Sequence, residues 1–115
     1  MGGEGTSLVV AVESTGWVHP VALAVGLRDR WRGLAALPGG VGLLLRTRSV
    51  HGRGLIDDCT VVWMEDDGRV LAVDDLPPRG LARGPGNACW ALELPRTSPT
   101  PGVGATVMVR PMLER

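Results

Sequence analysis

The residues best suited to chemistry gather in one short stretch, where His51 follows Ser49 and precedes Asp57 and Asp58. An imidazole beside a carboxylate can act as a general base, and a serine hydroxyl that it activates can act as a nucleophile. The six residues from His51 to Asp57 span roughly 20 Å in an extended chain, so these groups meet only if the chain turns back between them. The stretch is therefore compatible with a small hydrolase or isomerase that uses His51 with Asp57 or Asp58.

The same side chains also fit a structural role, which we expect in preference to catalysis. His51 can pack beneath the following strands with one ring nitrogen bonded to a main-chain carbonyl, while Asp57 and Asp58 cap a turn. Together with Cys59 they offer atoms that bind metals, but without a spacing such as C-x-x-C or H-x-x-x-H that is typical of metal sites. We therefore assign no firm catalytic residue, and we expect no metal and no cofactor.

A basic cluster overlaps this stretch. Arg46, Arg48 and Arg53 fall within eight residues and flank His51. Guanidinium groups bind carboxylates and phosphates through paired hydrogen bonds, so these four residues predict a surface for an anionic ligand; the alternative is a solvated edge whose charges pair with one another. The glycines do not follow the G-x-G-x-x-G or G-x-x-x-x-G-K patterns, and the chain has no lysine, which excludes nucleotide binding by such loops.

These residues favour a small non-catalytic binding or protein-interaction module. We expect its contacts to come from residues 46–58 and from the Gly-, Pro- and Arg-rich segment 79–87, which has no periodicity and reads as the longest irregular connection. The expected partner is an unidentified small ligand or protein. The 12 arginines balance the 12 Asp and Glu residues, so nucleic acid is not expected as a partner.

The length of 115 residues predicts a single domain over residues 1–115 that buries a core without metals or disulfides. The start has no basic segment followed by an apolar stretch, and no apolar run approaches the roughly 20 residues that cross a bilayer, so we expect a soluble cytoplasmic protein without a membrane partner. Cys59 and Cys89 could form a disulfide if their strands are neighbours, but we expect free thiols in that reducing compartment. The sequence is compatible with a monomer or a homodimer.

The predicted fold is organised around a β-hairpin whose turn is Asp67-Gly68. An Asp-Gly pair between apolar runs is typical of a two-residue turn, which needs a positive φ at both positions. Cross-strand partners step outward in pairs from such a turn, so that Met64 faces Leu71. In this register one face of the hairpin carries an apolar patch that other strands must cover, made of Val62, Met64, Leu71 and Val73.

The rest of the chain reads mainly as short strands. Pro20 cannot donate to a neighbouring strand, so its strand is expected at a sheet edge or after that residue. Residues 27–37 change to a helical period, because Leu27, Trp31, Leu34 and Ala35 fall on one face. The elements together predict a mainly-β sandwich or barrel with one short α-helix. The further strands are expected at residues 7–13, 17–25, 41–46, 88–94 and 105–110.

Short motifs occur along this chain in a distinctive order. They are R-x-R-G-L at residues 30–34, L-L-L-R at 43–46, R-S-V-H-x-x-G at 48–54, D-G-R-V-L at 67–71, L-P-P at 76–78, L-E-L-P at 92–95 and G-x-x-V at 104–107. This ordered set resembles the bacterial and archaeal family called domain of unknown function 192, with residues 21–107 as the family-like core. The resemblance implies a compact, mainly-β fold with one short helix, and it implies no particular reaction.

The chain departs from that family in the stretch that holds His51. Members that resemble this subgroup read S-V-H-T-F-G-M and then P-I-D. This chain instead has Arg53 in place of the aromatic residue, Asp58 in place of the proline and Thr60 in place of the aspartate. A functional surface built from those positions in relatives would therefore be altered here.

Overall fold

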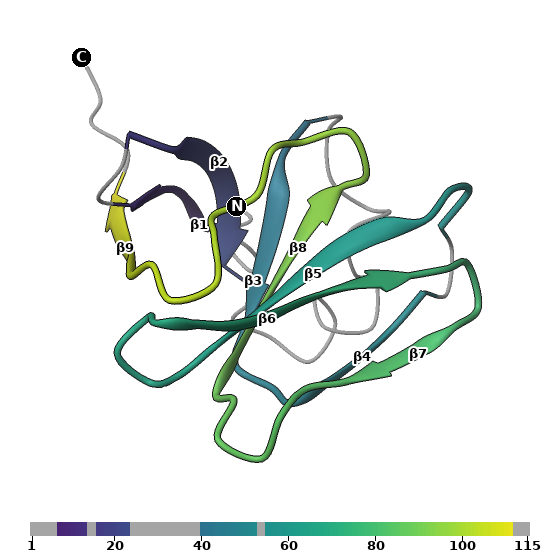
Figure 1. Ribbon diagram of the computed structural model, residues 1–115. Helices are drawn as coiled ribbons and strands as arrows, with labels where there is room; N and C mark the ends of the chain where they lie inside the picture. The colour runs from purple at the N-terminus through teal and green to yellow at the C-terminus, as the bar shows by residue number, and fades with distance from the viewer. Residues whose placement is uncertain (1–6, 14–15, 24–39, 53–54, 112–115) are drawn as a thin grey trace.

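The computed structural model describes residues 7–13, 16–23, 40–52 and 55–111, and in this part of the chain the regular elements are strands (Figure 1). A mainly-β protein is therefore confirmed, while the helix predicted over residues 27–37 lies outside the described residues. The strands are β1 (Ser7–Glu13), β2 (Val18–Leu23), β3 (Gly42–Leu45), β4 (Ser49–His51), β5 (Cys59–Met64), β6 (Val70–Leu76), β7 (Leu81–Arg83), β8 (Trp90–Pro95) and β9 (Val107–Pro111).

One large sheet has the strand order β6-β5-β8-β3-β2-β1-β9, and β4 pairs with β7 in a separate ribbon. Neighbours in the large sheet run antiparallel except for β2 and β3, which are parallel. The two edges of this sheet meet, because Val70 N–H donates to the Ala105 carbonyl at 2.8 Å and Val107 N–H donates to the Gly68 carbonyl at 2.9 Å. Figure 1 shows the segment before β9 beside the turn between β5 and β6. The sheet is therefore curled.

The curled sheet has an apolar layer on each face of β5. This strand is buried at every position, as expected for a strand covered on both faces, with Trp63 in one layer and Met64 in the other. Trp63 is fully buried, and its indole N–H donates to Asp74 Oδ2 at 2.9 Å, so its polar group is satisfied. The Met64 layer contains the buried residues Val21, Leu44, Val62, Met64, Val70, Leu92, Leu94 and Val107.

The turn between β5 and β6 is longer than the sequence predicted. Glu65 N–H donates to the Arg69 carbonyl at 2.9 Å, and this hydrogen bond closes a loop of residues 66–68. Within the loop, Gly68 alone has a positive φ, which is 94°. A three-residue loop of this kind ends in a left-handed glycine and inserts a bulge. The prediction of a two-residue turn with positive φ at Asp67 as well is therefore wrong.

The longer turn also changes the face that β6 presents. Val62 pairs with Val73 as predicted, but the register shifts at Met64, which pairs with Val70 instead of Leu71. Val70 is 1% exposed in the Met64 layer, whereas Leu71 is half-buried against the Trp63 layer. Val73 is 37% exposed, so the predicted four-residue apolar face is correct for β5 and wrong for β6.

Two other expectations about strands need correction. Segment 79–87 is not irregular throughout, because β7 lies within it and pairs with β4. β2 is not an edge strand, since it pairs with both β1 and β3. Its pairing with β3 begins at Val21, immediately after Pro20, so the missing N–H of the proline interrupts no pairing with that strand.

Candidate ligand-binding pocket

A pocket of about 390 Å³ lies where the two edges of the curled sheet meet. It is bounded by the 66–68 turn and by residues of β2, β3, β5, β8 and β9. Its volume falls within the range of about 300–1,000 Å³ that is common for small-molecule sites. The described lining residues are Leu23, Leu44, Met64, Asp66, Asp67, Gly68, Trp90, Val107, Met108 and Val109.

The walls are apolar because they belong to the Met64 layer of the core. Leu44, Met64 and Val107 are buried there, and the half-buried Leu23 and Trp90 pack against them. A methionine side chain adapts its shape to a neighbour, and an indole ring offers a flat apolar face. Each Å² of apolar ligand surface removed from water by such walls would contribute about 25 cal/mol. The pocket is therefore suited to an apolar group.

Charged side chains lie at the rim of the pocket. Arg46 follows β3, and its Nη1 donates to Asp66 Oδ1 at 2.7 Å. The guanidinium carbon of Arg46 lies 4.9 Å from the centre of the Trp90 ring, which is within range of a cation–π contact. The hydrogen bond to Asp66 raises the pKa of Arg46, so the guanidinium stays charged. A cation is thus held between a carboxylate and an indole that both belong to the pocket.

The turn that carries the rim is anchored by the segment before β8. Cys89 N–H donates to the Met64 carbonyl at 2.8 Å, and the Asn87 side-chain amide donates to Glu65 Oε2 at 2.8 Å. One bond fixes Met64 at the end of β5, and the other fixes Glu65, the residue before the 66–68 loop. The segment before β8 therefore holds the chain in place where it leaves β5 and enters the turn.

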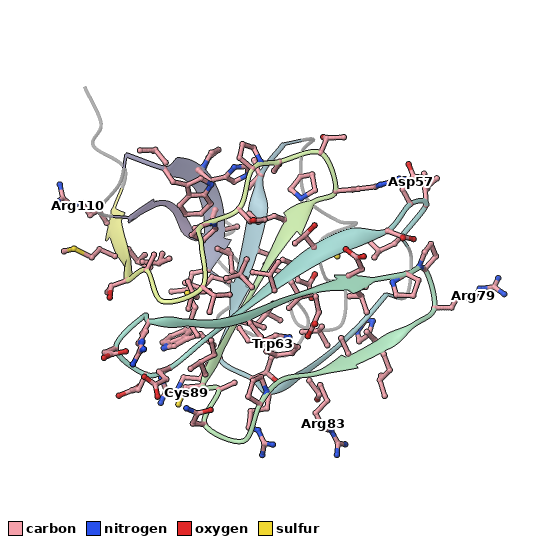
Figure 2. The ribbon with its side chains drawn as sticks, viewed as in Figure 1. Asp57, Trp63, Arg79, Arg83, Cys89 and Arg110 are labelled. Carbon is pink, nitrogen blue, oxygen red and sulfur yellow. The ribbon has the colours of Figure 1, made fainter. Side chains whose placement is uncertain are left out.

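The residues predicted for catalysis come from a short strand and from the segment that precedes β5. His51 ends β4 and pairs with Leu81 of β7. Asp57 and Asp58 lie at the opposite end of β5 from the turn, where Figure 2 shows Asp57. They line an open hollow of about 450 Å³ together with Pro95, Arg96 and Thr97, and His51 is not among its lining residues. The hollow thus brings the two aspartates together with Arg96.

Two of the residues predicted for an anionic ligand, Arg46 and Arg48, have different partners. Arg46 lies at the rim of the pocket with Asp66, whereas Arg48 donates from Nε to the Pro85 carbonyl at 3.2 Å. Arg53 lies outside the described residues. Arg46 therefore pairs with a carboxylate and Arg48 bonds a main-chain carbonyl, and which of the two predictions holds for this edge stays open.

Both cysteines are free thiols, as predicted. Burial, with smaller effects of Glu93, Asp58 and Asp75, raises the pKa of Cys59 to about 12, so its thiol is protonated and unreactive at neutral pH. Within the described residues, no three His, Cys, Asp or Glu side chains are grouped so that they could hold a metal ion. That part of the chain also contains no helix that could cross a membrane.

Sequence reasoning missed most of the pocket. The patterns place Leu44, Met64 and Trp90 in strands, but their spacing indicates a core and gives no sign of a cavity. One signal could have pointed to Trp90. The chain has no Phe or Tyr, so its four tryptophans supply all the aromatic bulk, and a tryptophan in a short strand is a reasonable candidate for a binding surface.

Comparison with known proteins shows that the fold occurs elsewhere, and it shows no family and no function for this chain. No protein-family model and no curated protein matches the chain. A "putative transcription regulator" from Sinorhizobium meliloti matches with a TM-score of 0.69 at 16% identity, over 94% of this chain and 98% of that one. A protein of unknown function from Novosphingobium aromaticivorans has a TM-score of 0.64 at 16% identity, over 90% and 84% of the two chains. A hypothetical protein from Synechocystis has a TM-score of 0.56 at 16% identity, over 91% of this chain and 19% of that one.

Proposed function

We propose that this protein is a small non-catalytic binding module that holds a compact ligand with an apolar body in the pocket beside the 66–68 turn. The observation that carries the proposal is the pocket itself, whose walls include Leu44, Met64, Trp90 and Val107. Ligand sites typically combine apolar walls with a few polar groups that orient the ligand, and this pocket has both. Its volume of about 390 Å³ suits a compact ligand.

Binding is preferred to the hydrolase or isomerase that His51 with Asp57 or Asp58 would form. His51 does not line the hollow of the two aspartates, so this hollow does not contain the pair that the alternative requires. The resemblance to domain of unknown function 192 stays a prediction, and it implies no reaction. The likeness to a "putative transcription regulator" is compatible with a domain that senses a ligand, while the balanced charge of this chain does not favour direct contact with nucleic acid.

A nuclear magnetic resonance titration with benzyl alcohol tests the proposal. This probe is compact and largely apolar, and ¹⁵N labelling turns each backbone amide and each indole N–H into a reporter. We expect the amide of Gly68 and the indole of Trp90 to shift along one saturable curve in the millimolar range. The indole of Trp63, which lies in the other apolar layer, should stay in place. The absence of any saturable shift at Gly68 and Trp90 would refute binding in this pocket.

A matched pair of variants separates the pocket from non-specific contact. Val107→Phe adds a ring at the buried wall, and Val103→Phe adds the same ring at a site that is 67% exposed and does not line the pocket. We expect benzyl alcohol to bind Val103→Phe and not Val107→Phe. If Val107→Phe does not fold, Met108→Trp introduces the bulk from the exposed end of the same wall. Unchanged binding by a folded wall variant would overturn the proposal.

A further inference from the structure

The charge at the rim of the pocket points to the chemistry of its ligand. The described lining residues are apolar except for Gly68, Asp66 and Asp67, so each charged group among them is a carboxylate. Asp67 Oδ1 accepts the Arg69 N–H at 3.0 Å, and its second oxygen has no hydrogen-bond partner within the described residues. A ligand that enters the pocket therefore meets an acceptor of hydrogen bonds that carries a negative charge.

Arg46 already shows how a cation fits at this rim. Its guanidinium donates to Asp66 at 2.7 Å and lies 4.9 Å from the centre of the Trp90 ring. A cation in such a position gains from a charge-assisted hydrogen bond and from the electron-rich face of the indole. The side chains of Arg46 and Asp66 are 56% and 75% exposed, so water and salt screen their attraction and a competing cation can replace the guanidinium.

Among the described residues at the turn, the carboxylates outnumber the guanidinium groups. Glu65, Asp66 and Asp67 lie together in the sequence, against Arg46 and Arg69. Arg69 is exposed and does not line the pocket. An anionic ligand would have to approach two rim carboxylates, which is unfavourable, whereas a cationic ligand would be attracted to them.

We propose that the pocket selects an organic cation, meaning an ammonium or a related group attached to a compact apolar body. The apolar body packs against Leu44 and Met64, and the cation lies beside Trp90 and the carboxylates of Asp66 and Asp67. This inference rests on the proposed function, because it names the class of ligand for the same pocket.

Three probes of nearly equal size test the inference in the wild-type protein: benzylammonium, benzyl alcohol and benzoate. We expect benzylammonium to bind about three- to tenfold more tightly than benzyl alcohol, with benzoate the weakest, because the cation adds ionic and cation–π contacts. The preference should decrease as salt is added. Equal affinity for all three, or tightest binding of benzoate, would overturn the inference and leave the proposed function intact. Binding of none would overturn both.

Variants of the rim test which groups create the preference. Asp67→Asn keeps an Oδ1 acceptor for Arg69 N–H but removes the charge, and should weaken benzylammonium binding while leaving benzyl alcohol unchanged. Arg46→Ala frees Asp66 and should strengthen benzylammonium binding. Asp75→Asn, on an exposed part of β6 outside the pocket, is the matched control and should change neither affinity. A cation preference that survives both Asp67→Asn and Asp66→Asn would overturn the inference.

Discussion

Replacing Gly68 with alanine tests the contact that closes the sheet. Gly68 has a φ of 94°, a left-handed angle that costs an L-residue about 1–2 kcal/mol. An added Cβ would also overlap the carbonyl oxygen of Val107. β9 must then move, which weakens the hydrogen bond from Val107 N–H to the Gly68 carbonyl, worth about 1 kcal/mol. Alanine recovers about 0.4–1 kcal/mol by restricting the unfolded chain, so we expect Gly68→Ala to lower the free energy of unfolding by about 2 kcal/mol.

Gly104 provides a control with the same backbone angle. Its φ is also 94°, but an added Cβ would meet no atom within 4 Å. Gly104→Ala therefore carries the cost of the left-handed angle without an overlap, and alanine recovers about 0.4–1 kcal/mol by restricting the unfolded chain. We expect a loss of about 1 kcal/mol. The difference between the two variants thus measures how closely Gly68 approaches Val107.

Urea unfolding followed by tryptophan fluorescence can measure both variants. If the slope of the transition is unchanged, the lower stability of Gly68→Ala appears as a lower midpoint. In a chain of this size, each kcal/mol also lowers Tm by about 4 °C. Equal losses for the two variants, within about 0.3 kcal/mol, would show that the turn does not contact β9 as described. The location of the pocket would then be wrong as well.

Two further predictions concern backbone strain and pH. Arg79 has a φ of 63° and projects away from the sheet in Figure 2. Arg79→Gly should therefore raise the free energy of urea unfolding by about 0.5–1 kcal/mol, while Arg83→Gly in β7 should lower it by a similar amount; destabilisation by Arg79→Gly would contradict the left-handed angle. Burial raises the pKa of Cys59 from 9.0 to about 12, so the unfolded chain loses the thiol proton first and stability should fall as pH rises above 9.0. The chain has no Lys or Tyr to titrate there, so this slope should be clearly smaller in Cys59→Val; an unchanged slope would contradict its assignment to Cys59.

The strands with the strongest patterns could be predicted because burial governs their composition. β5 and β8 read as apolar runs, and both lie inside the large sheet. The Asp-Gly pair located the turn but not its type, since a left-handed glycine serves three-residue as well as two-residue loops. The additional loop residue, Asp66, places Val70 where the shorter turn would place Leu71.

β4 and β7 could not be predicted, because each is only three residues long. So short a strand shows too little alternation to be distinguished from a loop, and its pairing partner lies far away in the sequence, as Ser49 and Arg83 do. The same limit applies to the predicted catalytic group. Nearness of His51 to Asp57 in the sequence says nothing about the direction of the chain after β4, and that direction decides whether the two side chains meet.

The pocket could not be predicted for another reason. It results from incomplete closure of the sheet. Within the described residues, hydrogen bonds join the two edges near Gly68 and Val107, whereas Met108 and Val109 pair with β1 and border the pocket. A ligand in this gap would contact both the turn and β9, so it would favour the joined state and stabilise the protein by mass action. Gly68→Ala, which pushes those two elements apart, should therefore weaken benzylammonium binding together with stability. Gly104→Ala should retain that binding, because it adds no overlap between the turn and β9.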